Sequence, residues 1–222
     1  MLKTILNELK KHAPFTFLGA LSGIVIILLL SGVSNKLSYT LFYIFHPIHV
    51  LLSAFVTVSL YKLYTIKNND IKNSKQGKKN LLKIFLIGYL GSVGIATISD
   101  SIIPYLGEIL LDLPNRGIHL GFIEKWYLVN PLAFLGIILA NFKPSTKFPH
   151  FGHVLLSTWA SLFHVMMAID AGINIALGSI ITLVLFLSVW LPCCVSDIVF
   201  PLLFINYGKK KEKEAKNESN SV

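Results

Sequence analysis

The sequence predicts an all-α polytopic membrane protein whose six transmembrane helices form a 3+3 inverted-topology repeat. Three observations predict this fold. Hydrophobic residues make up 54% of the 222 residues and charged residues only 14%, against roughly a quarter charged in an average soluble domain. The apolar residues fall in blocks of about 20, the length of helix that crosses a bilayer. Short motifs also recur, in the same order, in the two halves of the chain.

The apolar blocks define the expected membrane spans. We place them at 14–33, 40–62, 81–104, 126–142, 152–170 and 175–205. The last span is long and contains Pro192 and Pro201, which predict a kink or an early end. The amphipathic N-terminus carries no cleavage signal of small residues, so we expect the first span to be retained. The segment 105–125 is mildly amphipathic, which is typical of a connection lying along the membrane interface.

Three motif pairs indicate an internal duplication. HPIHVLLS begins at His46 and HFGHVLLS at His150, SDSIIP begins at Ser99 and SDIVFP at Ser196, and PFTFLG begins at Pro14 and PLAFLG at Pro131. Chance can supply one such match, but three in the same order favour a repeated unit. A three-span unit that follows another enters the membrane from the opposite side. This inverted repeat is the architecture of many secondary transporters.

The repeat divides the chain into four segments. Residues 1–110 form the first three-helix unit, 111–125 the outer connecting loop, 126–207 the second and inverted unit, and 208–222 a basic tail that we expect to be disordered. All of the 20 basic residues except Lys36, Arg116 and Lys125 fall on one side in this topology. Because basic loops remain in the cytoplasm, we expect both termini there and a location in the cell membrane. Membrane lipids are the expected surroundings, and so small a bundle is compatible with a homodimer.

The charge pattern argues against two other classes of protein. The net charge of +9 comes from lysines that flank apolar spans and not from a polar surface interleaved with aromatics, so we expect no nucleic-acid partner. No G-x-x-x-x-G-K-[ST] motif is present, so we expect no nucleotide cofactor. The adjacent Cys193 and Cys194 do not provide a disulfide framework.

Two histidines and an aspartate recur in each half at similar depth. His46, His49 and Ser53 share one helix face, and Asp100 lies near the same outer end of the next span. The second set, on the cytoplasmic side, consists of His150, His153, Ser157 and Asp197. An aspartate in hydrocarbon costs about 2.5–3.5 kcal/mol on insertion scales and usually faces a cavity or a partner.

These sets predict metal sites. Imidazole and carboxylate together are ligands for divalent Zn, Mn, Fe, Co or Ni. We therefore expect metal ligands at His46, His49, Asp100, His150, His153 and Asp197. Accessory positions are His12, Ser53, Ser99, Ser157, His164, Cys194 and Ser196. A thiolate would favour softer metals, although cysteines in apolar spans more often only pack. His119, beside Arg116 in the outer loop, is expected to be a surface residue.

The function that we expect is transport of a divalent metal cation by a permease, coupled to protons that exchange on the same histidines and aspartates. The alternative is an intramembrane metal-dependent hydrolase in which His and Asp hold Zn²⁺ and an activated water. The additional His and Cys of the second half favour that alternative. A third hypothesis is a carrier of another small or lipid-linked substrate, although few fixed cations lie deep in the spans. Helix–helix hydrogen bonding explains any single histidine equally well.

Overall fold

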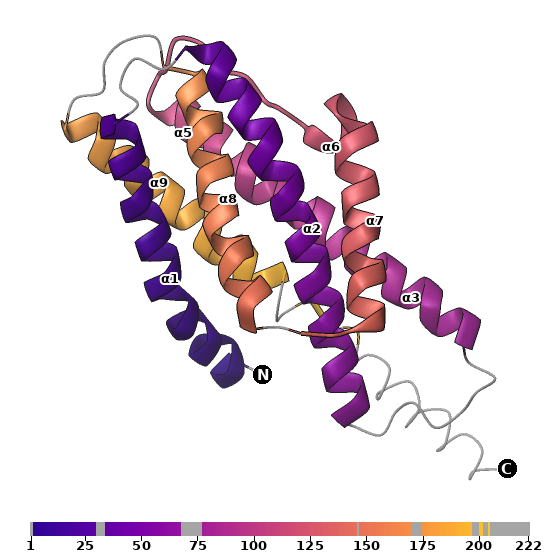
Figure 1. Cartoon of the computed structure of the whole chain (residues 1–222). Helices are drawn as coiled ribbons and strands as arrows, with labels where there is room; N and C mark the ends of the chain where they lie inside the picture. Colours follow the sequence, from indigo (N-terminus) through magenta and orange to yellow (C-terminus); the bar gives the residue numbers. More distant parts are fainter. Residues whose placement is uncertain are drawn as a thin grey trace, which may run out of the picture.

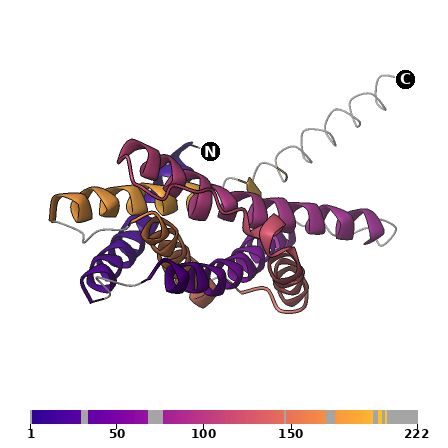
Figure 2. The ribbon, with the colours of Figure 1, turned by 90° about the horizontal axis from the view of Figure 1, so that it is seen from above.

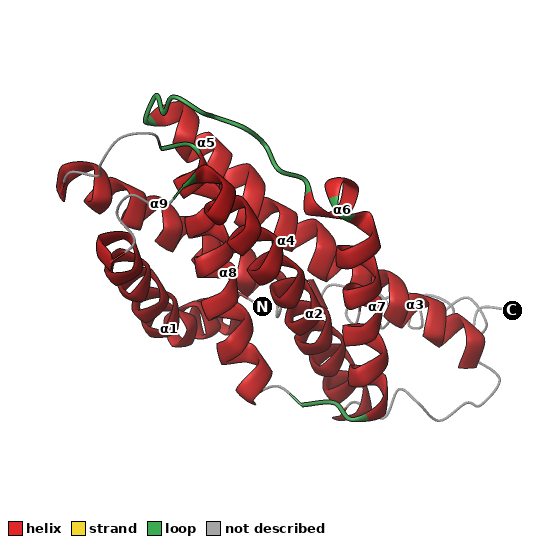
Figure 3. Cartoon of the chain, turned by 45° about the horizontal axis from the view of Figure 1, so that its top comes forward, coloured by secondary structure: helices red, strands yellow, loops and turns green. Residues whose placement is uncertain are grey.

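In the computed structural model the described part of the chain consists of helices joined by loops, with no strand among the described residues (Figure 3). The structure describes residues 2–29, 34–67, 77–145, 147–169, 175–196, 200–201 and 204. The predicted tail 208–222 and Asp197 lie outside them. The side chains of His12, His150 and Cys194 also lie outside the described part, although their helical backbone is included.

The long helices alternate in direction along the chain (Figure 1). They are α1 (Leu2–Leu29), α2 (Asn35–Lys67), the run of α3 (Gly77–Tyr89), α4 (Ile95–Thr97) and α5 (Ile103–Leu110), then α7 (Trp126–Phe142), α8 (Lys147–Met167) and α9 (Ile175–Cys194). The short α6 (Gly121–Glu124) precedes α7. Each of these helices except α6 overlaps one expected span, and α7 has the bounds that the sequence predicts.

The continuous run from α3 through α5, residues 77–110, is called the third helix below. It extends further than the span 81–104 that the sequence predicts. Residues 105–110, expected in the interfacial connection, are the continuation of α5. The reason is that Glu108, the acid that makes this segment look amphipathic, is only 1% exposed and bonds to His164. With its one charge turned inward, the segment leaves apolar side chains such as Leu106, Ile109 and Leu110 on the outside.

Three described helical segments are long and apolar enough to cross a membrane: Asn35–Thr65, Leu81–Leu110 and Ala176–Cys193. Shorter apolar helices cover Ala13–Ile26, Trp126–Phe142 and Phe151–Met167. Large apolar side chains also face outward all around the bundle, and Leu110 and Phe142 are more than four-fifths exposed. Soluble proteins rarely leave so much continuous apolar surface uncovered. Length and surface are therefore compatible with a membrane protein.

The arrangement of the helices places α2 at the centre. It packs along α8 on one side and α7 on the other, while α1 packs against α8 and α9. Seen from above, the α3–α5 run and α9 lie along one side of this row of helices (Figure 2). The third helix and α9 also contact each other, so that α2, α8, α9 and the third helix enclose the middle of the bundle.

Close packing of α2 against α7 depends on Gly136. A Cβ at this position would overlap the backbone carbonyl oxygen of Leu51 and touch the side chain of Ala54. Backbone atoms cannot move aside as a flexible side chain can. Only glycine therefore allows the two helices to approach this closely.

The third helix leaves regular α geometry on either side of α4. Leu90–Gly94 and Ile98–Ile102 are π-helical turns, which occur mostly as single turns inside α-helices and are frequent at functional sites. The Ser196 hydroxyl donates to the Gly91 carbonyl oxygen at 2.6 Å, and the Ser161 hydroxyl donates to the Ser99 carbonyl oxygen at 3.0 Å. The two irregular turns therefore bond directly to α8 and to the end of α9.

We expect Gly136→Ala to destabilise the protein by about 1–3 kcal/mol, as overpacking in a rigid interior does. In detergent, the unfolding midpoint should fall by roughly 2–10 °C. The matched control is Gly94→Ala, because a Cβ at Gly94 meets no atom within 4 Å and should leave the midpoint unchanged or slightly higher. Equal midpoints for the two variants would contradict the packing described here.

Candidate functional site

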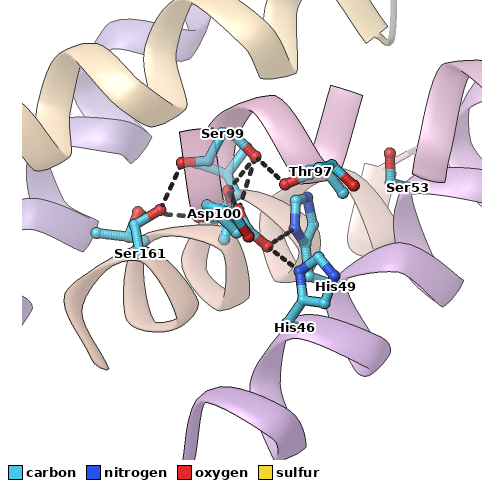
Figure 4. Close-up of polar contacts among 12 residues, drawn as sticks. His46, His49, Ser53, Thr97, Ser99, Asp100 and Ser161 are labelled. Atoms are coloured by element: carbon cyan, nitrogen blue, oxygen red, sulfur yellow. Dashed lines mark hydrogen bonds and ion pairs between the residues drawn. The ribbon is translucent and has the colours of Figure 1, made fainter. Parts of the chain in front are cut away.

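The carboxylate of Asp100 lies at the centre of the bundle and accepts four hydrogen bonds (Figure 4). Its Oδ2 accepts Nδ1–H of His46 at 2.8 Å and of His49 at 2.7 Å. Its Oδ1 accepts the hydroxyls of Ser99 at 2.6 Å and Ser157 at 2.7 Å. All five side chains are at most 2% exposed. Hydrogen bonds to a charged group contribute about 1.5–3 kcal/mol each, which offsets the cost of removing the carboxylate from water.

This geometry determines which ring nitrogen each histidine presents to its surroundings. An ionised carboxylate only accepts hydrogen bonds, so Nδ1 of His46 and His49 carries the proton and Nε2 of each neutral ring has a lone pair. Among the described residues, Nε2 of His46 has no hydrogen-bond partner. It faces Gly121, where a Cβ would lie 2.7 Å away, and its ring stacks on Phe42 with centroids 5.2 Å apart. His46 is thus enclosed by the outer loop.

His49 also belongs to a second cluster of ligand-type side chains. One ligand atom from each of His49, His153 and Cys193 lies within 4.8 Å of the other two, and all three side chains are buried. The ring centroids of His49 and His153 are 5.6 Å apart. Among the described residues, the other group of this kind is His46, His49 and Asp100. His49 therefore connects Asp100 to α8 and α9.

The depth of the sites differs from the expectation. His46 and His49 were expected near the outer end of their span and His153 near the cytoplasmic end, but the rings of His49 and His153 lie only 5.6 Å apart. Residue 51 is the midpoint both of the expected span 40–62 and of α2 (Asn35–Lys67), so His49 lies near the middle of its helix and not at its outer end. The expected pairing of His49 with Asp100 is confirmed at 2.7 Å. The other expected pairing, of His153 with Asp197, lies outside the described residues.

Hydroxyl groups of α2 and α8 contact the two Ser-Asp motifs in the same way. Ser53 and Thr57 of α2 each have a hydroxyl 3.2 Å from that of Ser196. On α8, the Ser157 hydroxyl lies 3.3 Å from that of Ser99, and the Ser161 hydroxyl donates to the Ser99 backbone oxygen at 3.0 Å. Ser53 and Thr57 occupy the sequence positions in HVLLS-x-x-x-[TS] that Ser157 and Ser161 occupy in the second copy. Ser196 is therefore bonded by hydroxyls of α2, and Ser99 by hydroxyls of α8.

A third cluster lies between α5, α8 and the outer loop. Nδ1 of His164 bonds to Oε1 of Glu108 at 2.8 Å, and both side chains are almost fully buried. The backbone N–H of Gly117 donates to Oε2 of Glu108 at 3.3 Å, and the His119 ring lies 5.4 Å from that of His164. Glu108 was not among the candidate residues expected from the sequence. His164 was expected as an accessory residue of the second site, and His119 was expected on the surface, whereas its side chain is only 26% exposed.

The outer loop is attached to α2 through Glu124. Its carboxylate accepts the Tyr43 hydroxyl at 2.6 Å and the backbone N–H of Leu120 at 3.1 Å, and Nδ1 of His119 lies 3.4 Å away. Partial burial alone would raise the pKa of Glu124. The hydrogen bonds from Tyr43 and His119 outweigh that effect and hold the pKa of Glu124 below its ordinary value.

Comparison of the chain with models of protein families, with curated proteins and with solved structures found no match. The chemistry of the site therefore rests on its own residues. They are a carboxylate, several imidazoles and a thiol, buried together among apolar helices. Such a set suits binding of a cation or movement of a proton.

We expect the Glu108–His164 pair to be strongly coupled. His164→Leu alone leaves a buried carboxylate without its main partner and should cost about 3–5 kcal/mol. The double variant Glu108→Leu with His164→Leu should recover most of that loss, because an apolar pair of similar volume needs no partner. Unfolding midpoints of the two single variants and the double variant, measured in detergent, check this. Additive losses would show that the two side chains do not interact.

We expect Glu124→Gln to lower thermal stability at neutral pH, with the difference from the native chain disappearing in acid. A carboxyl whose folded pKa lies below its unfolded value of about 4.3 stabilises the protein above that value and loses the contribution as the pH falls through the folded pKa. Unfolding midpoints between pH 7 and pH 3 measure this dependence. A difference that stays constant over this range would exclude the ionised Glu124 as the loop anchor.

Proposed function

We propose that the chain is an integral membrane transporter for a divalent transition-metal cation. In this proposal six spans form two inverted three-helix units, both termini face the cytoplasm, and the cation passes through the centre of the bundle beside Asp100. One observation carries the proposal. Asp100 is 0% exposed within an apolar helix and is bonded by His46 and His49 of one half and by Ser157 of the other.

A purely structural role explains this arrangement less well. Asp100 and its buried partners could together be replaced by apolar side chains with little loss or even a gain in stability, because desolvation of a charge consumes most of what its partners return. Ionisable residues within membrane spans usually mark an ion or proton pathway. The site is also sealed by side chains of at most 2% exposure, which suits an occupant as small as a bare ion better than a lipid or peptide.

The hydroxyl contacts support the inverted repeat. Ser53 and Thr57 meet Ser196 as Ser157 and Ser161 meet Ser99, which is the reciprocity that a two-fold axis between the halves requires. In transporters with inverted repeats, one unit rocks against the other around a site at their junction. The Asp100 site has ligand-type residues from both proposed units, so such a motion would change its access from one side of the membrane to the other.

Coupling to protons follows from the ligand chemistry. A metal ion binds only deprotonated imidazole, carboxylate or thiolate, so loading the site releases protons and protonation releases the metal. The cation candidates are divalent Zn, Mn, Fe, Co and Ni, which accept nitrogen together with oxygen or sulfur. Protons, membrane lipid and a second copy of the chain are the further partners in this proposal.

The test is metal uptake into proteoliposomes containing the purified protein. We expect Asp100→Asn to lower the uptake rate at least about tenfold, because loss of a carboxylate that orients a ligating histidine typically costs 10–100-fold in metal affinity. Asp112→Asn is the matched control. Its side chain is 89% exposed, and its backbone φ of 50° is one that asparagine adopts readily. Its uptake should equal that of the native chain.

The outcomes separate the proposed function from its alternative. Native uptake with Asp100→Asn, in a variant that remains folded, would exclude transport through this site. Hydrolysis of lipid or peptide by the native chain, with no uptake, would replace the transporter by a membrane hydrolase.

A further inference from the structure

We infer that His49, His153 and Cys193 form the cation-binding site and that they select a borderline-soft divalent ion of the Zn²⁺ class. The role of this site in transport rests on the proposed function. The metal binding does not rest on the proposed function, because it follows from the three ligands themselves. Asp100 is a positioning residue in this site, not a ligand.

The three ligands converge from three helices. His49 projects from α2, His153 from α8 and Cys193 from α9, and their ligand atoms are within 4.8 Å of one another. Around a tetrahedral Zn²⁺ at ordinary bond lengths, nitrogen and sulfur ligands are separated by roughly 3.3–3.8 Å. Small rotations of the side chains would therefore bring the three atoms onto one ion.

Asp100 prepares His49 for this role. The Nδ1–H of His49 donates to Asp100 at 2.7 Å, which leaves Nε2 as the nitrogen with a lone pair for a ligand. Metal-binding histidines almost always donate their other ring N–H to a carboxylate or carbonyl group, which orients the ring and increases its basicity. Asp100 itself already accepts four hydrogen bonds, so its oxygens are engaged in holding side chains in place.

The ligand types determine the class of ion. Two imidazoles and a thiolate suit Zn²⁺, Co²⁺ and similar ions, whereas Mg²⁺ and Ca²⁺ require oxygen ligands. When the metal binds, it replaces the proton of the Cys193 thiol. The thiolate and the Asp100 carboxylate together then carry two negative charges, which match one divalent cation in surroundings where a net charge is costly. Three protein ligands leave a fourth position on a tetrahedral ion open, which permits exchange.

The experiment loads the purified, chelator-treated protein with Co²⁺, because a thiolate bound to Co²⁺ produces a charge-transfer band in the near ultraviolet. The chain contains only two cysteines, Cys193 and Cys194. We expect the band in the native chain and in Cys194→Ser, where Cys193 is the one remaining thiol, and no band in Cys193→Ser. Zn²⁺ should abolish the band by displacing Co²⁺, and Mg²⁺ should not.

Two further variants test the geometry. Asp100→Asn should retain the band but weaken Co²⁺ binding about 10–100-fold, as expected for loss of an orienting carboxylate. Asp112→Asn should change neither. Zn²⁺ at about 100 times its Kd should raise the unfolding midpoint of the native chain and of Cys194→Ser by roughly 5–10 °C.

The outcomes distinguish this inference from the proposed function. A band in Cys193→Ser, or its absence from a folded Cys194→Ser, overturns the assignment even if metal uptake is observed. A band with the expected dependence on Cys193, but without uptake into proteoliposomes, supports the metal site and contradicts transport. Because Cys194→Ser retains the proposed ligands, the test remains decisive even if Cys193→Ser does not fold.

Discussion

The four hydrogen bonds to Asp100 are the constraint on which the rest of the structure depends. A carboxylate without partners in an apolar helix bundle would be prohibitively costly, so its donors have to arrive together from α2, α8 and the third helix itself. His46 and His49 fix the rotation of α2, and Ser157 fixes that of α8. The π-helical turn Ile98–Ile102 contains Ser99, Asp100 and Ser101, all fully buried. Ser99 and Asp100 belong to the central network, while the Ser101 hydroxyl donates to the backbone oxygen of His119 in the outer loop at 2.6 Å.

The Asp100 cluster lies close to the other buried ionisable groups of the bundle. Phe42 stacks on His46 at 5.2 Å and meets the edge of His164 at 5.4 Å, so one aromatic ring separates the Asp100 cluster from the Glu108–His164 pair. On the far side of that pair, the ring of His119 in the outer loop lies 5.4 Å from the ring of His164. A series of imidazoles therefore leads from the outer loop to the centre of the bundle, and Phe42 lies between His164 and His46 in this series. For the proposed transport, these residues would offer a cation or a proton polar partners on both sides of Phe42.

Much of the fold was predictable, because apolar blocks and flanking lysines report directly on helix length and position. The pairing of His49 with Asp100 also followed, since repeated motifs place both residues at similar depth. The position of Glu108 did not follow, because its burial depends on His164, which is remote in sequence. The choice between Cys193 and Cys194 could not be made either. Adjacent residues point about 100° apart on a helix, and only the packing of α9 decides which of them faces the histidines. Cys194 was the cysteine expected as an accessory ligand, whereas the structure brings Cys193 to His49 and His153.

The central claim is that an ionised Asp100 holds two neutral imidazoles by their Nδ1–H groups. Nitrogen-15 NMR of histidine-labelled protein measures this directly, because protonated and unprotonated ring nitrogens resonate far apart. The account predicts two rings protonated at Nδ1 and unprotonated at Nε2 in the metal-free native chain, identified by their loss in His46→Gln and His49→Gln. Spectra in which both rings carry their proton at Nε2 would contradict it, since Asp100 would then lack the donors that make its burial possible.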